Sequence, residues 1–255
     1  MKNILEIMKN KNEVLLMYGA ICLLGALVCI IISRYSVLEV MGVNAWMKPI
    51  KFFISVTVFS WTMGWYLQYL ENQRQVEIYS WSMVVLFSVE MVLIIYQAAQ
   101  GKMSHFNQET AIDRTIFSLM ALAITVLMLH TLYIAILFFK QSQFEAPETL
   151  ILAVKLSLLV TVLFAFEGFV MGAALKHTIG SQDGSQGLPL VNWSTRHGDL
   201  RVAHFFGIHA LQIIPLLSYW LARSKREVMV IAFVYFAFVS YTLWLALQGK
   251  PLIKL

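Results

Sequence analysis

Four ionisable residues stand out because they lie in, or just beside, long apolar segments of the chain. Glu90 and Glu167 lie inside such segments, Lys51 lies near the start of another, and His105 lies in a connection. An ionised side chain costs roughly 2.5–3.5 kcal/mol at the centre of a bilayer, so it rarely occurs there without a role. We therefore take these four as candidate catalytic or proton-relay residues, although each glutamate could instead be protonated or hydrogen-bonded between helices. Lys48, one turn before Lys51, is expected to stay among the lipid headgroups.

Three histidines, His177, His204 and His209, are candidate metal ligands, because histidine is the commonest metal ligand. His204 and His209 are five residues apart. That spacing is about 140° around a regular helix, so the two would bind one metal only if the helix were distorted. A transition metal or haem held by these residues is therefore a hypothesis that depends on local helix geometry.

A further set of polar and aromatic residues is expected at the same side of the membrane as the histidines. We assign these as candidate substrate-binding residues: Gln97, Gln100, Asn107, Trp193, Arg196 and Arg201. Glu90 and Gln97 are seven residues apart and so share one face of a helix. Arg196 and Arg201 could hold an anionic group or simply lie in the membrane interface.

Four other residues have structural interpretations. Asp199 is well placed to cap a helix that begins at Leu200, because its carboxylate can accept hydrogen bonds from free N–H groups of the first turn. Gly168 and Gly172 form a pair of small residues four apart, which lets a neighbouring helix approach closely. Pro215 predicts a kink in its own helix.

The composition requires that these residues be positioned by membrane-spanning helices. Of 255 residues, 59% are hydrophobic and only 13% are charged, which leaves too little polar surface for a soluble globule. A span needs ~20 mostly apolar residues. We predict an all-α membrane protein, a bundle of seven transmembrane helices with no soluble domain. The predicted spans are residues 14–33, 50–70, 79–99, 115–139, 150–175, 203–222 and 228–248 of a single bundle, 1–255.

The charge distribution predicts an orientation and a lipid environment. The formal net charge is +5, which in a membrane protein usually reflects orientation and headgroup contact, and no nucleic-acid-binding motif is present. The turn 223–226 has three cations, and Lys2, Lys9 and Lys11 precede the first span. Positive residues favour the cytoplasm, so we predict a cytoplasmic N-terminus and an external C-terminus, although many cations also fall on the opposite side.

The longest connection, residues 176–202, differs from the others. Its glycine-rich part, 180–187, should be irregular, whereas residues 188–193 are largely apolar. Burying a large apolar side chain is worth roughly 1.5–3 kcal/mol, so we expect Leu190 and Trp193 to fold back onto the bundle with their neighbours. The connection is therefore interpreted as a lid over a polar cavity.

Three phrases of the sequence resemble those of a family of bacterial integral membrane proteins described only as uncharacterised. They are Trp46 to Phe52, Ser104 to Asn107, and Asp199 to Gln212. The resemblance covers most of the chain and implies a multi-pass protein of the bacterial cytoplasmic membrane. It implies no activity.

Two main functional hypotheses follow from the polar residues. The first is a membrane-embedded enzyme that uses a metal or haem on a lipid-like or quinone-like substrate. The alternative is a proton-coupled transporter of a small molecule, in which the buried glutamates relay protons. A membrane sensor or assembly factor is a third hypothesis. Membrane lipids are the expected partners in every case, and nucleic acid is not.

Overall fold

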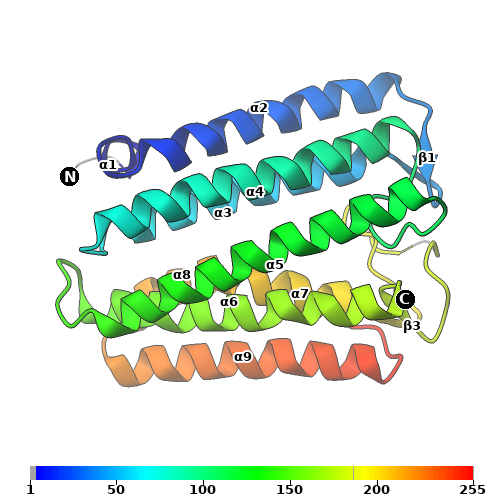
Figure 1. Cartoon of the computed structure of the whole chain (residues 1–255). Coiled ribbons are helices and arrows are strands. Elements are labelled where there is room, and N and C mark those ends of the chain that lie inside the picture. Colours follow the sequence, from blue (N-terminus) through cyan, green and yellow to red (C-terminus); the bar gives the residue numbers. More distant parts are fainter. Residues whose placement is uncertain (1–3, 186, 255) are drawn as a thin grey trace. The chain divides into compact units, whose positions relative to one another are not determined.

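The computed structural model describes residues 4–185 and 187–254, and it is mostly helical (Figure 1). The chain divides into two compact units, Met1–His130 and Thr131–Leu255, and one helix, α5, continues from the first into the second. In chain order the elements are α1 (Ile4–Lys11), α2 (Glu13–Tyr35), β1 (Glu39–Val40), β2 (Val43–Asn44), α3 (Met47–Leu67), α4 (Gln73–Ala99), α5 (Ala111–Lys140), α6 (Glu148–Ala174), β3 (Thr178–Ile179), β4 (Gly198–Asp199), α7 (Leu200–Ile208), α8 (Ala210–Leu221) and α9 (Lys225–Leu247).

Helices occur at all seven positions where spans were predicted, but seven spans are not confirmed. Five helices of the described chain, α2, α4, α5, α6 and α9, are long and apolar enough to cross a membrane. The bent pair α7 and α8 makes a sixth if it counts as one span. The helix α3 is not among them, and its sequence explains why: Lys48 and Lys51 lie in its first turns, and several hydroxyl residues follow.

The exposed faces of these helices are apolar. Leu24 on α2 is 62% exposed, Leu122 on α5 is 60% exposed, and Phe233 on α9 is 70% exposed. A water-soluble protein rarely exposes apolar surface so extensively, whereas a lipid-facing helix does so as a rule. The chain therefore has the surface of a multi-pass membrane protein.

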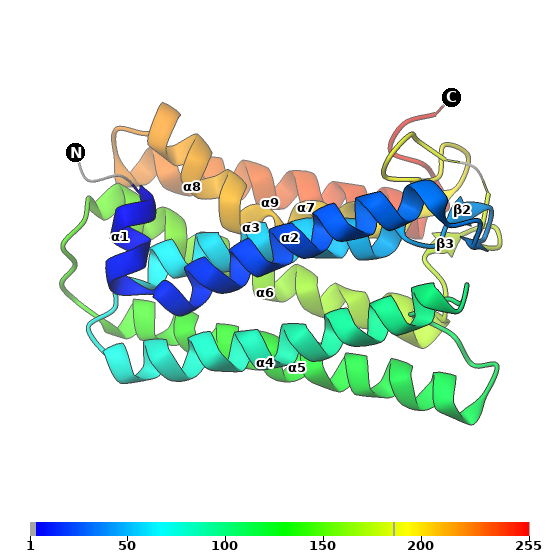
Figure 2. The same ribbon diagram turned by 90° about the horizontal axis from the view of Figure 1, so that it is seen from above.

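In the first unit, α2 and α3 lie side by side in close contact (Figure 2). Small residues of α2 allow this approach: a Cβ atom at Gly19 would meet the indole of Trp61, and one at Gly25 would meet the ring of Phe53. The hydroxyl of Thr57 also donates to the carbonyl oxygen of Gly19 at 3.1 Å. Close backbone approach through small residues is the usual way in which membrane helices gain packing energy.

In the second unit, α6 packs against α7, α8 and α9. The short strands β3 and β4 pair antiparallel, with Thr178 opposite Asp199, and so join the two ends of the long connection. The chain passes directly from β4 into α7, and Asp199 is the N-cap of that helix, as predicted. The start of α7 is therefore fixed to the end of α6 through the paired strands.

The sixth predicted span is broken at His209, where α7 and α8 meet at an angle of 55°. Two hydroxyl groups bond to carbonyl oxygens beside the bend: Tyr235 donates to Phe206 at 2.6 Å, and Thr161 donates to Ile208 at 3.3 Å. The helix α8 continues through Pro215, and the kink predicted there stays a prediction. The neighbouring helices α6 and α9 supply the hydroxyls that stabilise the bend at its actual place.

We predict that Gly207→Ala strongly destabilises the second unit. A Cβ atom at this position would lie 2.0 Å from Cβ of Phe164, which is too close to the α6 backbone to move away. Overpacking of this kind typically costs about 1–3 kcal/mol or more. Gly64→Ala is the matched control, because its nearest neighbour is the flexible end of Met8 at 2.9 Å. Thermal unfolding of both purified variants should lower the Tm for Gly207→Ala much more than for Gly64→Ala, and equal Tm values would contradict this account.

Candidate functional site

The most unusual side chain of the second unit is Glu167, which lies in α6 against α7. It is 8% exposed, and neither carboxylate oxygen has a hydrogen-bond partner among the described residues. Its nearest ionisable neighbour is His204, whose Nδ1 lies 3.4 Å from Oε2. The predicted close approach at Gly168 is confirmed, since a Cβ atom there would lie 3.2 Å from Cε1 of the His204 ring. The small residue of α6 thus makes room for the imidazole beside the carboxylate.

The hydrogen bonding of His204 defines which nitrogen can exchange a proton. Nδ1 lies 2.9 Å from the carbonyl oxygen of Phe164, and a carbonyl oxygen can only accept, so Nδ1 bears a hydrogen. That hydrogen is engaged by Phe164, which explains why the longer contact with Glu167 is not a hydrogen bond. The other nitrogen, Nε2, is therefore the one that has no hydrogen when the ring is neutral. A buried carboxylate without hydrogen bonds is costly unless a proton or a nearby cation compensates it.

His209 lies at the bend between α7 and α8, five residues after His204. Its Nδ1 is 3.2 Å from Oε1 of Gln212, and its ring lies 4.4 Å from the ring of Phe205. The helix is thus distorted at the second of the two histidines. However, no group of three or more His, Cys, Asp or Glu side chains in the described part of the chain is placed to hold a metal ion. The predicted set of metal ligands, which included His177, is therefore not supported.

The end of the long connection is organised by the buried carboxylate of Asp199. It accepts hydrogen bonds from the backbone N–H of Ser194 at 2.9 Å and of Arg201 at 3.1 Å. The Arg201 guanidinium binds the same carboxylate through two nitrogens, at 2.9 and 2.6 Å, and it also donates to the carbonyl oxygen of Asn192. Arg201 thus fastens the connection to the start of α7.

The beginning of the same connection is organised by Asp183. Its carboxylate accepts hydrogen bonds from the backbone N–H groups of His177 and Thr178, at 3.1 and 2.9 Å. The Nδ1 atom of His177 lies 3.3 Å from Asp183 and 3.9 Å from Asp199. His177 therefore lies between two carboxylates that shape the loop. Asp183 was not among the residues predicted from the sequence, although a lone aspartate in a glycine-rich turn commonly binds nearby backbone N–H groups.

The lid over a polar cavity stays a prediction, although part of the apolar segment packs on α7 as expected. The indole of Trp193 packs against Phe205 and Phe206 of α7, with ring centroids 5.4 and 5.8 Å apart. The expectation for Leu190 is wrong, because this residue is 81% exposed. Arg196 is also exposed. Trp193 therefore anchors the apolar half of the connection to α7, while Leu190 remains exposed.

In the first unit, Lys48 and His105 form a polar contact at the start of α3. Nζ of Lys48 and Nδ1 of His105 are 3.1 Å apart, and the hydroxyl of Ser104 lies at the same distance from that nitrogen. Glu90 is buried in α4, close enough for the charge of Lys48 to act on it, and its Oε2 has no hydrogen-bond partner in the described chain. Lys51, the lysine favoured from the sequence, is exposed. Lys48 therefore contacts His105, and the expectation that it lies only among the lipid headgroups is wrong.

The remaining candidates of this unit mainly stabilise the segment before α5. Gln97 is fully buried and donates to Asp113 at 2.9 Å, and Lys102 pairs with the same aspartate at 3.3 Å. Gln100 is exposed and bonds within its own helix, to the carbonyl oxygen of Tyr96. Asn107 is buried, and its amide bonds to the backbone of its own loop at residues 103 and 109. The sequence could have revealed Asp113, because it follows Thr110 by three residues in a capping-box pattern.

No protein-family model, no curated protein and no solved structure matches this chain. The resemblance of its three phrases to a bacterial membrane family stays a prediction. We therefore infer the function from the arrangement of the side chains alone. Glu90 and Glu167 are buried carboxylates, and each has an oxygen that forms no hydrogen bond in the described chain. Packing of the helices does not explain why a carboxylate is buried at either position.

We predict that Asp199→Asn releases the long connection. Hydrogen bonds to a charged group are each worth about 1.5–3 kcal/mol, and the amide cannot bind the guanidinium of Arg201 through two oxygens. Trypsin should therefore cleave after the exposed Arg196 about tenfold faster in the variant than in the parent, as for any locally destabilised segment. Glu148→Gln, which alters an exposed carboxylate of the same unit, should leave the rate unchanged. Equal cleavage of Asp199→Asn and the parent would mean that Asp199 does not hold the loop.

Proposed function

We propose that this chain is a proton-coupled carrier of a small solute in a bacterial cytoplasmic membrane, with Glu167 and His204 as the proton-binding pair. The observation that carries the proposal is the buried Glu167 carboxylate, which has no hydrogen-bond partner in the described chain and lies 3.4 Å from Nδ1 of His204. Ionisable groups inside membrane segments commonly mark proton relays and solute pathways. The pair is also next to a broken helix, the element on which many carriers build their sites.

The pair of Glu167 and His204 is better suited to binding and releasing a proton than to holding one permanently. An ionised Glu167 requires a positive charge nearby, which a proton on Nε2 of His204 would supply. A proton on Glu167 itself would also remove the cost of burial. The pair can thus hold one proton in two ways, and a bound solute that favours one of them would couple its own binding to proton release or uptake.

The enzyme hypothesis, with a lipid-like or quinone-like substrate, explains the same buried residues but needs a group that performs the reaction. No group of three or more potential metal ligands is found among the described residues. The structure therefore adds no support for a metal-dependent enzyme. A sensor or assembly factor would not require an exchangeable proton deep in α6. The carrier is therefore the function that the geometry favours, with the N-terminus proposed to be cytoplasmic.

We predict that Glu167→Gln abolishes coupled transport. Proteoliposomes that contain a pH-sensitive dye would be exposed in turn to organic cations, organic anions and neutral solutes across an imposed gradient. The parent should move protons with one class of solute, and Glu167→Gln should not, because an amide side chain is neither protonated nor deprotonated near neutral pH. Glu167→Asp should retain part of the flux. It keeps a carboxyl group, but the shorter side chain places that group farther from His204.

The matched control is Glu148→Gln, because Glu148 is an exposed carboxylate at the start of the same helix. It should transport as the parent does. Proton movement that persists in Glu167→Gln would remove Glu167 from the mechanism. Turnover of a quinone or lipid by the parent, without proton-coupled solute flux, would favour the enzyme hypothesis instead.

A further inference from the structure

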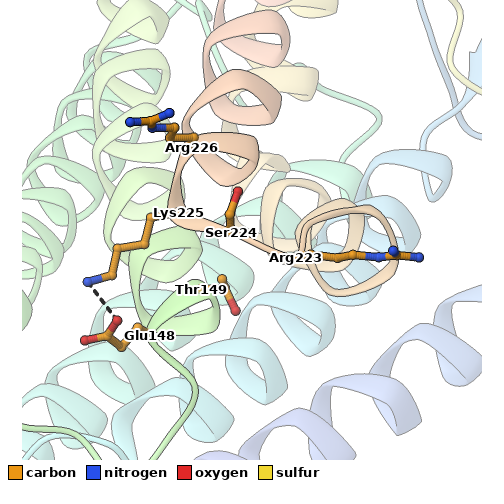
Figure 3. Close-up of a pocket in the computed structure, with 6 residues that line it drawn as sticks. All are labelled: Glu148, Thr149, Arg223, Ser224, Lys225 and Arg226. Atoms are coloured by element: carbon orange, nitrogen blue, oxygen red, sulfur yellow. Dashed lines mark ion pairs between the residues drawn. The ribbon is translucent and has the colours of Figure 1, made fainter.

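Two adjoining depressions lie on the surface of the second unit, at the ends of α6, α8 and α9. The first is lined by Glu148, Thr149, Arg223, Ser224, Lys225 and Arg226 (Figure 3). The second shares Glu148 and Lys225 with the first and extends to Phe144, Ile151 and Lys155. Because α6 and α9 are candidate spans, their ends lie where lipid headgroups are found.

The depressions have more positive than negative charge. Among the residues that line them, the single carboxylate, Glu148, pairs with Lys225 at 2.8 Å, and this ion pair lies at the boundary between the two depressions. The nearby carboxylate of Glu227 accepts a hydrogen bond from the backbone N–H of Arg223. Arg223 and Arg226 have no ion-pair partner within residues 4–185 and 187–254. Figure 3 shows their guanidinium groups extending to either side of the depression, with the hydroxyl-bearing side chains of Ser224 and Thr149 between them.

The second depression combines a cation with apolar walls. The ammonium group of Lys155 lies 4.9 Å from the ring centroid of Phe144 and 5.5 Å from that of Phe139. Ile151 and Leu152 complete the wall. Lys155 thus reaches from within α6 toward the membrane surface, with its stem along apolar side chains. Such a site suits a negative group whose attached chains are apolar.

Exposed aromatic residues just before the cationic turn extend the apolar surface. Tyr219 and Trp220 of α8 are 78% and 75% exposed, and Leu216, one turn earlier, is 57% exposed. Tyrosine and tryptophan are typical of the membrane–water interface, because one end of each ring system is polar and the rest is apolar. Acyl chains can therefore contact α8 while a headgroup lies at the turn that follows it.

We infer that the two depressions together bind one anionic phospholipid with two phosphate groups, of the cardiolipin type. One phosphate would lie at Ser224 and Thr149, which can donate hydrogen bonds, and the exposed side chains of Arg223 and Arg226 would turn toward it from either side. The other would lie at Lys155, on the far side of the Glu148–Lys225 ion pair. Basic pockets between membrane helices are known to suit such headgroups, and two separate cationic positions favour two phosphates over one. This site is separate from Glu167 and does not depend on the proposed transport function.

Native mass spectrometry of the detergent-purified protein tests this inference, with cardiolipin, phosphatidylglycerol and phosphatidylcholine added in equal amounts. The parent should retain cardiolipin in preference to phosphatidylglycerol, and phosphatidylcholine least. The double variant Arg223→Gln/Arg226→Gln should bind cardiolipin about thirtyfold more weakly, the fold-change that corresponds to the loss of two cations at about 1 kcal/mol each. All substituted side chains are exposed or half-buried, so folding should be preserved.

Two further variants separate the positions. Lys155→Met should remove the preference for cardiolipin over phosphatidylglycerol while leaving phosphatidylglycerol bound at the other phosphate position. Lys140→Gln is the control, because Lys140 is an exposed cation outside both depressions, and it should bind lipid as the parent does. Equal retention of the two anionic lipids by the parent would overturn the inference. So would displacement of cardiolipin by excess inorganic phosphate alone, or binding that is unchanged in the double arginine variant.

Discussion

The structure depends on one constraint: within an apolar environment, every polar group must find its partner in the protein itself. The bend at His209 illustrates this constraint most clearly. A helix can change direction inside a membrane only if backbone groups near the break are satisfied, and hydroxyls of Thr161 and Tyr235 bond to carbonyl oxygens there. These two contacts come from α6 and α9, so the bend exists only in the packed unit. The bend in turn positions His209 beside Gln212.

The same constraint divides the buried carboxylates into two kinds. Asp199 accepts hydrogen bonds from two backbone N–H groups and from a guanidinium, and Asp113 is bonded to Gln97, Thr110 and Lys102. Charge-assisted hydrogen bonds are strong enough to compensate the loss of water, so these two aspartates are structural. Each holds a connecting segment to the start of the helix that follows it.

Glu90 and Glu167 are of the other kind, because buried oxygens of each lack a hydrogen-bond partner in the described chain. Both glutamates lie within helices, whereas the two aspartates lie near helix starts. Leaving a buried charge unpaired is costly, and a fold that needed only stability would gain from an apolar residue in either place. That cost is the physical reason for assigning function to the glutamates and not to the aspartates.

The sequence by itself determined where the long apolar helices lie, the cap at Asp199 and the close approach at Gly168. These features depend on local pattern: apolar length, the residue before a first turn, and the absence of a side chain. Only the tertiary structure decided that the helix breaks at His209, that Lys48 contacts His105, and that Glu167 lacks a hydrogen bond. A helical period predicts which face a residue occupies, but hydrogen bonding depends on which groups the neighbouring helices bring within about 3 Å.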